Sequence, residues 1–455
     1  MTSTLLCVLG CGSGATASNA GPASAGGSGD SSSSGGADNG SSGANNGSAG
    51  ANNSAGANNS AGANNSAGAN SSAGANSGGN GSGGALSIVP APVVVCTADG
   101  KLPTGTPALI KDTWVDVRPA GIPWGDNGQA TGLAINPCNP AVMYVCIGSF
   151  DTSPQSLSGM YRTVDGGANW ARVARVIHPN YTGTTYIDGC ATVRVDPKNP
   201  SRVYVGQGVR GNNQGFWVSD DAGDSFDLPK TFGTFGNTED GDVYDIALDP
   251  AESNHILVTF HSGDKTNYPD SGVAVTPDGG KTWTYVTPQK GWGSGHSINF
   301  LRNPNDLTQG NSETWLLGTQ GSGLWRTTDS GATWAQVTSE NIQHGGGGIY
   351  YDSAGFLYAS GAESTLKSTD NGATWTKVGP SSGYNAVHGD GKTMFIGPSL
   401  GPDAQLYSSE EGKGDTWTPF NSQKFRQGPF EMVFDPKNQV LYASMWTDGV
   451  WALKR

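Results

Sequence analysis

Carboxyl, imidazole and phenol side chains recur at the borders of short apolar stretches in this sequence. Two carboxyl groups that flank a glycosidic bond can act as acid and base in its hydrolysis. Histidine and tyrosine can instead remove and donate the protons of an elimination reaction. The residues that we single out as candidate catalytic groups are Asp151, Asp188, Asp242, His261, His296, His344 and Tyr384.

A second set of residues has the chemistry to hold a substrate rather than to react with it. Arginine neutralises carboxylates, and tryptophan rings offer flat apolar faces that suit sugar rings. The candidates of this kind are Arg210, Trp124, Trp292, Trp446 and Glu431. Whether these side chains meet depends on the elements that carry them.

An eight-residue motif recurs along the chain and sets the spacing of those elements. Its pattern is hydroxyl, any residue, Asp, any residue, Gly, any residue, hydroxyl, aromatic. An Asp carboxylate accepts backbone N–H groups inside a tight turn, Gly supplies a positive φ, and the aromatic residue opens the next strand. We interpret the motif as a repeated hairpin turn, with a worn further version at residues 408–412. The clearest copies are residues 163–170, 219–226, 276–283, 327–334 and 368–375.

These motifs resemble the Asp-box, or BNR repeat, of sialidase-like and sortilin-like β-propellers. In that family the box joins the third and fourth strands of a blade, on the face away from the usual ligand site. The resemblance therefore implies an all-β propeller and a structural role for each box. We accordingly leave the box carboxylates out of the catalytic candidates, namely Asp165, Asp221, Asp278, Asp329 and Asp370.

Between the motifs the chain repeats one plan of short apolar strands, of which the first often ends in Asn-Pro or Asp-Pro. The last unit, from Phe430 onward, has three strands and no box, whereas residues 113–118 form a strand that belongs to no unit. Pairing the two closes a ring and removes two exposed sheet edges. We predict a single seven-bladed propeller of four-stranded antiparallel blades over residues 113–455, closed by that N-terminal strand.

In a propeller the innermost strand of each blade starts at the mouth of a central funnel, and the second strand ends there. By this rule the candidate residues gather around one mouth, with Asp245, Asn299 and Glu431 slightly deeper. The structural alternative is that inner-strand Asp and His residues only hydrogen-bond neighbouring blades or channel water. Tryptophans at a rim can likewise serve only to cover loops.

The first unit is also similar to that of glycoside hydrolase family 74, the xyloglucan-cleaving enzymes. The similarity is carried by Asn136-Pro137, by Val142-Met-Tyr-Val and by Gly159-Met-Tyr-Arg162, and the segment 249–257 has the same character. In that family an Asp after the second strand acts as base, which implies this role for Asp151. Those enzymes take the acid from a second propeller, whereas we expect one propeller here. The acid would then come from Asp188, Asp242 or Glu431.

Two further classes of function remain open. A polysaccharide lyase would use His261, His296, His344 or Tyr384 as base and acid, and Arg210 to neutralise a uronate carboxylate. A non-catalytic propeller would bind a sugar or assist assembly, since a fold does not fix a function. Sialidase chemistry is disfavoured, because the Arg-Ile-Pro motif of that family and an arginine triad are missing. We favour a glycoside hydrolase acting on a plant or microbial cell-wall polysaccharide.

Composition separates the front of the chain from the predicted propeller. Residues 12–85 are almost wholly Gly, Ala, Ser and Asn, which leaves no apolar surface to offset conformational entropy and predicts a disordered linker. Residues 86–112 form an apolar leader that we expect to pack on the propeller. The formal net charge of −13 argues against nucleic acid as a partner. No apolar run is long enough for a transmembrane helix.

Val8-Leu9-Gly10-Cys11 resembles a bacterial lipobox without the basic residues that usually precede one. We interpret residues 1–11 as a truncated lipoprotein-type signal with a possible lipid anchor at Cys11, and expect a cell-surface or secreted protein. The expected partner is a polysaccharide or oligosaccharide, and the expected state is a monomer. No cofactor or metal site is indicated, although a structural calcium in the channel is left open.

Cys96, Cys138, Cys146 and Cys190 follow the predicted signal and linker and allow three disulfide pairings in an exported chain. A Cys96–Cys138 bond would pin the leader to the first blade. Four buried free thiols fit the sequence equally well.

Overall fold

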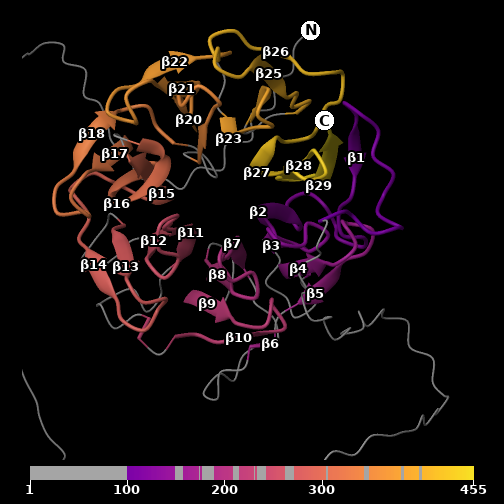
Figure 1. The fold of residues 1–455 in the computed structure, drawn as a ribbon, viewed down its shortest axis with the longest axis horizontal. Coiled ribbons are helices and arrows are strands. Elements are labelled where there is room, and N and C mark those ends of the chain that lie inside the picture. The colour runs from indigo at the N-terminus through magenta and orange to yellow at the C-terminus, as the bar shows by residue number, and fades with distance from the viewer. Residues whose placement is uncertain are drawn as a thin grey trace, which may run out of the picture. The chain divides into compact units, whose positions relative to one another are not determined.

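The computed structural model describes residues 100–148, 157–173, 175–176, 189–208, 215–229, 231–232, 242–261, 271–303, 306–342, 348–380, 384–398 and 402–455. The predicted signal, the linker and most of the leader lie outside these segments. Within them, the strands form seven antiparallel blades arranged in a ring (Figure 1), as predicted. No helix with the length and apolarity needed to cross a bilayer occurs among the described residues.

In each blade the first strand lies nearest the axis and the following strands are added outward. Blade 1 contains β2 (Gln129–Ile135), β3 (Met143–Gly148), β4 (Gly159–Thr163) and β5 (Ala171–Val173). Blade 2 contains β7 (Cys190–Val195), β8 (Val203–Gln207) and β9 (Gly215–Ser219), and its fourth position is taken by the short β10 (Ser225–Phe226), which also pairs with β6 (Arg175–Val176). Blade 3 contains β11 (Val243–Leu248), β12 (Ile256–Phe260), β13 (Val273–Thr276) and β14 (Thr284–Val286).

The remaining blades follow the same plan. Blade 4 contains β15 (Gly295–Asn303), β16 (Asp306–Thr319), β17 (Gly323–Thr327) and β18 (Ala335–Thr338). Blade 5 contains β19 (Ile349–Tyr351), β20 (Leu357–Ser360), β21 (Thr365–Ser368) and β22 (Thr376–Val378). Blade 6 contains β23 (Tyr384–Gly389), β24 (Thr393–Pro398), β25 (Tyr407–Glu410) and β26 (Thr418–Pro419). Blade 7 contains β27 (Pro429–Asp435), β28 (Val440–Met445), β29 (Gly449–Lys454) and β1 (Trp114–Asp116).

Blade 7 confirms the predicted closure of the ring. Strand β1 from the front of the described chain pairs with β29 from its end, with Trp114 opposite Leu453 and Asp116 opposite Trp451. The closing strand is shorter than the predicted 113–118, although Val117 still donates its N–H to the Val450 carbonyl. Because β1 pairs with one side of β29 and β28 with the other, the last strand of the chain has neighbours on both sides and the ring is closed by hydrogen bonds.

The core lies between neighbouring blades, where apolar residues of facing sheets interdigitate. Between blades 1 and 2, for example, Tyr144, Met160, Val205 and Trp217 are all nearly inaccessible to solvent. Burying an apolar side chain of this size contributes about 1.5–3 kcal/mol. Successive side chains of a strand point to opposite faces of the sheet, so strands that are buried throughout, such as β3 and β12, supply contacts to the blades on both sides.

The repeated motif forms a tight turn held by its Asp carboxylate. In the copy at residues 368–375, Asp370 accepts the Ser368 hydroxyl, the Thr374 N–H and the Thr374 hydroxyl at 2.8, 2.8 and 2.6 Å. The Gly372 N–H donates to the Ser368 hydroxyl, and Gly372 has a φ of +82°. In the other four clear copies the Asp again accepts the first hydroxyl and the backbone N–H four residues on. In the copy at residues 163–170 the third donor is the Asn169 side-chain amide. The motif is therefore a structural turn.

The worn version in blade 6 works differently. Glu410, at the position of the Asp, is exposed and pairs with Lys413. The next residue, Glu411, points inward and accepts the Tyr350 hydroxyl at 2.5 Å and the N–H groups of Ser353 and Gly391 at 2.8 Å. Here a buried glutamate ties blade 6 to blade 5 instead of closing its own turn.

Removing one motif carboxylate should destabilise the fold in a pH-dependent way. Burial alone would raise the pKa of Asp370, but its hydrogen bonds outweigh burial and lower it. The stability that Asp370 contributes is therefore present above its unfolded pKa of about 4 and lost as pH falls through the lower folded value. We expect Asp370→Ala to lower the melting temperature by roughly 2–4 °C at neutral pH and by less in acid.

Thermal unfolding followed by circular dichroism at several pH values measures this difference. The control is Asp126→Ala, since Asp126 is exposed. A loss of equal size at neutral and acidic pH would contradict the role assigned to the carboxylate.

Candidate functional site

The strand registers identify one face of the ring as the predicted mouth. Asp242 and His296 lie at the beginnings of the innermost strands of blades 3 and 4, and His261 and Trp446 directly follow second strands. The repeated turns lie at the opposite ends of the strands: Thr163, which begins one, faces Met143 and through it Ile135 at the end of β2. We call the first face the mouth and the second the turn face.

Most innermost strands carry an irregularity near the mouth. The register of first and second strands shifts within the first few residues of β2, β7, β11, β15, β23 and β27. Such bulges re-aim side chains and leave backbone groups without a ladder partner. The mouth is therefore lined by strand segments whose N–H groups need other acceptors.

A buried ion-pair network crosses the channel below the mouth. Arg194 of β7 contacts Asp245 of blade 3 and Glu431 of blade 7, each with an N–O distance of 2.8 Å. Its Nε also donates to the Ile246 carbonyl at 3.0 Å. The guanidinium of Arg194 thus links blade 2, which carries it, to blade 3 and to blade 7.

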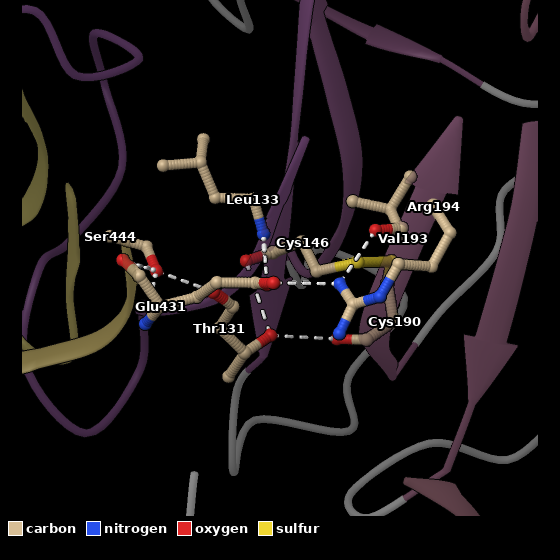
Figure 2. The surroundings of a disulfide bond; sticks show 8 residues. All are labelled: Thr131, Leu133, Cys146, Cys190, Val193, Arg194, Glu431 and Ser444. Carbon is tan, nitrogen blue, oxygen red and sulfur yellow. Dashed lines mark hydrogen bonds and ion pairs between the residues drawn. A yellow bond between two sulfur atoms is a disulfide. The ribbon is translucent and has the colours of Figure 1, made fainter. Parts of the chain in front are cut away.

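The two carboxylates also accept backbone N–H groups from further blades. Glu431 accepts the Leu133 N–H of blade 1 at 2.8 Å, as Figure 2 shows. Asp245 accepts the Ile298 N–H of blade 4 at 3.0 Å. Both donors lie on innermost strands, just after the register shifts of β15 and β2, and the carboxylates supply their acceptors. We call Arg194, Asp245 and Glu431 the channel network.

Burial and charge oppose each other within the channel network. Burial raises the pKa of Asp245 and of Glu431, and the nearby guanidinium offsets this only in part. Burial alone would lower the pKa of Arg194, but the two carboxylates outweigh it and raise the pKa. The side chains keep 27%, 13% and 23% of their surface for Arg194, Asp245 and Glu431, and all three line a cavity in the channel.

That cavity is small for a sugar-binding site. It measures about 190 Å³, whereas sites for drug-sized ligands measure roughly 300–1,000 Å³. Arg194, Glu431 and His388 also line a second cavity toward the turn face, so these three side chains stand between the two cavities. A polysaccharide would have to lie across the mouth. The described residues contain no cluster of three His, Cys, Asp or Glu side chains arranged to hold a metal.

Asp242 and His261 form a pair at the mouth. The His261 ring Nδ1 lies 3.3 Å from the Asp242 carboxylate. The backbone N–H of His261 donates to the backbone carbonyl of Asp242 at 2.8 Å. A Cβ atom on Gly208 of blade 2 would lie 2.3 Å from the Asp242 carboxylate, so only glycine fits there. Blade 2 thus packs directly against the Asp242 side chain of blade 3, and Asp242 is only 6% exposed.

Aromatic rings surround this pair. Tyr244 stacks on His296 with centroids 4.8 Å apart, and His261 lies 5.5 Å from each of these rings. From blade 7, Phe430 approaches Tyr244 at 6.1 Å and packs edge-on against Trp446 at 5.4 Å. The predicted residues Asp242, His261, His296 and Trp446 are thus brought together at one mouth.

The structure corrects the prediction for Trp292 and locates Trp124. Trp292 is fully buried in the core between blades 3 and 4, packed against Trp325 and Trp334, so it offers no ring face to a sugar. Trp124 is partly exposed and lies under the Arg118 guanidinium, 5.9 Å from its ring centre. A position in a loop between blades did not distinguish a buried ring from an exposed one.

Several predicted site residues cannot be placed. Asp151, Asp188, Arg210 and His344 lie outside the described residues, and for Tyr384 only the backbone, in β23, is described. Their assignments as catalytic or substrate-binding groups stay predictions.

Sequence reasoning missed the residue at the centre of the channel. Arg194 is the one charged residue of the apolar strand Cys-Ala-Thr-Val-Arg-Val, and a charge at that place signals a buried partner. Tyr244 and Phe430 were also missed. In a regular strand each would point away from its charged neighbour, Asp245 or Glu431, yet all four line the cavity.

A disulfide joins blades 1 and 2 beside the channel network (Figure 2). Cys146 of β3 is bonded to Cys190 of β7, and the Thr131 hydroxyl contacts the carbonyls of both. Cross-linking residues 44 positions apart stabilises a fold by about 4 kcal/mol in the chain-entropy account. Free thiols at these positions are therefore the wrong alternative. Cys138 is also disulfide-bonded. Its predicted partner, Cys96, lies outside the described residues, so that pairing stays a prediction.

Comparisons with known proteins give related sequences but no family assignment. No family model matches the chain. A protein of Neosartorya fischeri named "Probable oligoxyloglucan-reducing end-specific xyloglucanase" is 23% identical over 317 residues, which are 67% of this chain and 35% of that protein. A xyloglucanase of Hypocrea jecorina is 26% identical over 255 residues, 50% of this chain and 29% of that protein. The chain spans about a third of the length of the curated relatives it matches.

Solved structures with the same fold include two different kinds of protein. The GH74 xyloglucanase from Xanthomonas campestris superposes with a TM-score of 0.52 at 19% identity, over 75% of this chain and 53% of that one. A structure of YCF48 bound to D1 peptide superposes with a TM-score of 0.50 at 16% identity, over 76% of this chain and 98% of that one. At these identities the likeness shows a shared fold.

The channel network leads to a prediction about stability. Arg194→Met leaves two buried carboxylates without a counter-charge, which should cost about 3–5 kcal/mol at neutral pH. Because the folded pKa values of Asp245 and Glu431 are raised, the cost should appear above those values and fade as pH falls through them, where both carboxylates become protonated. Denaturant unfolding at neutral and acidic pH measures the difference.

The matched control for this substitution is Arg202→Met. Arg202 pairs with Asp220, whose side chain is 73% exposed, so its loss should cost at most about 1 kcal/mol. If Arg194→Met were as mild as the control, the network would not hold the blades together.

Proposed function

We propose that this chain is a carbohydrate-active propeller, a glycoside hydrolase that cleaves a cell-wall polysaccharide of the xyloglucan class lying across the mouth. The observation that carries the proposal is the match to curated xyloglucanases, which extends over 67% of this chain in the longest case. The fold, shared with a xyloglucanase structure, agrees with it. The small channel cavity supports binding of the polymer across the mouth rather than through the ring.

Among the described carboxylates, Asp242 is best placed to take part in the chemistry. It stands at the start of an innermost strand, and its carboxylate faces the imidazole of His261. That imidazole can relay a proton to or from the carboxylate, as an acid or base requires. We assign Asp242 the acid role, with Asp151, the position matched by the family resemblance, as the base.

A polysaccharide lyase is the second candidate. The stacked His261, His296 and Tyr244 supply groups able to remove and donate protons. A lyase also needs a cation to neutralise the uronate carboxylate. Arg194, the channel arginine, is already paired with two carboxylates, so that role would fall to Arg210. This makes the lyase the weaker proposal.

We further propose that the protein works outside the cytoplasm. The Cys146–Cys190 disulfide supports this, because such bonds persist in oxidising compartments. The lipobox-like segment and the linker agree with a tethered, exported protein.

An assay of the full chain with xyloglucan tests the proposed function. We expect new reducing ends, and we expect Asp242→Asn to lower kcat by about 10²–10⁴-fold, the usual effect of removing an acid or base. The control is Glu410→Gln, at an exposed residue of the turn face, which should leave kcat unchanged. Melting curves establish that both variants are folded.

The same assay separates the alternatives. Unsaturated uronate products from an acidic polysaccharide, with no hydrolysis of xyloglucan, would favour the lyase. Retention on immobilised polysaccharide without any new ends would favour a binding propeller and refute the hydrolase.

A further inference from the structure

A second, larger cavity opens on the turn face between blades 7, 1 and 2. It measures about 390 Å³, and its apolar lining includes Ile135, Val195, Val433 and Phe434. All four side chains are only partly buried. Apolar surface left in water is unfavourable by about 25 cal/mol per Å². We call this cavity the turn-face pocket; it is separate from the mouth, and nothing in the proposed hydrolase uses it.

The front of the described chain begins at the rim of this pocket. The Gly100 carbonyl accepts the Asn438 side-chain amide at 2.9 Å, and the Leu102 N–H donates back to the same side chain at 3.4 Å. The Lys437 side chain, which lines the pocket, lies so close to Gly100 that a Cβ there would be 2.3 Å from it. The segment before Gly100 therefore starts beside the pocket.

A covalent tie fixes a second point at the same rim. Cys138 stands between Pro137 and Pro140, which both line the pocket, and it is disulfide-bonded. Cys146 and Cys190 are bonded to each other, so the partner of Cys138 is Cys7, Cys11 or Cys96. Cys96 is four residues from Gly100, and four residues of extended chain span about 13 Å.

The segment that precedes these two points has the chemistry of the pocket. Residues 86–95 read Leu-Ser-Ile-Val-Pro-Ala-Pro-Val-Val-Val, in contrast to the Gly, Ala, Ser and Asn before them. We propose that residues 86–95 bind in the turn-face pocket, with Cys96 bonded to Cys138 at its rim. The chain thereby covers the exposed apolar lining of the turn-face pocket.

Photo-crosslinking of the full chain tests this proposal. A benzoylphenylalanine placed at Phe434 should crosslink within the same molecule to residues 86–95, as identified by mass spectrometry. The matched control is the same group at Phe356, which is also partly buried and lies at the turn-face end of blade 5. It should give no crosslink to that segment.

A second variant separates specific binding from mere proximity. Val94→Asp should reduce the yield of the crosslink from position 434 several-fold, because a carboxylate is disfavoured in an apolar pocket. The control Ser82→Asp, in the linker before the segment, should leave the yield unchanged. Melting curves establish that each variant is folded. Crosslinks from position 434 that join two molecules, or that reach only residues outside 86–95, would overturn the proposal. Neither result bears on hydrolysis at the mouth.

Discussion

The charge of one guanidinium near the axis constrains the rest of the ring. Arg194 is largely withdrawn from solvent, with 27% of its side chain exposed, and such a charge is tolerable only with close counter-charges. Asp245 and Glu431 supply them, but each carboxylate must itself be satisfied and takes an N–H from the inner strand of another blade. Blades 1, 2, 3, 4 and 7 therefore share one hydrogen-bonded centre, and their inner strands cannot shift register independently.

The network lies where the inner strands are irregular. The N–H groups of Leu133 and Ile298 point toward the axis, where the two carboxylates accept them, and each donor lies just after a register shift in its own strand. In β11 the register shifts between Val243 and Asp245, and the adjacent residues Tyr244 and Asp245 both line the cavity. The channel network and the aromatic mouth therefore both depend on the irregular starts of the inner strands.

The sequence was a good guide wherever local chemistry determined the outcome. The repeated turn depends on residues within eight positions, so its carboxylate, glycine and aromatic residue predicted it, and the unpaired first strand predicted the closure with blade 7. Arg194 was missed because its partners lie 51 and 237 positions away. Trp292 was misplaced because burial depends on the neighbouring blade. The cysteine pairing could not be chosen, since several connectivities fit the same spacing.

The network also decides which carboxyl groups remain for chemistry in the proposed hydrolase. Glu431 was a candidate acid, but one of its oxygens accepts from Arg194 and the other from the Leu133 N–H. If Glu431 turned toward a sugar, the guanidinium would keep Asp245 as its one carboxylate partner in the channel network. Asp242 stands outside the channel network, at the mouth, and pairs with His261. A hydrolase built on one propeller would then pair Asp242 with a carboxyl from a loop after a second strand, as Asp151 is. Their separation would set the outcome, with retention of configuration at about 5–5.5 Å and inversion at about 6.5–9.5 Å.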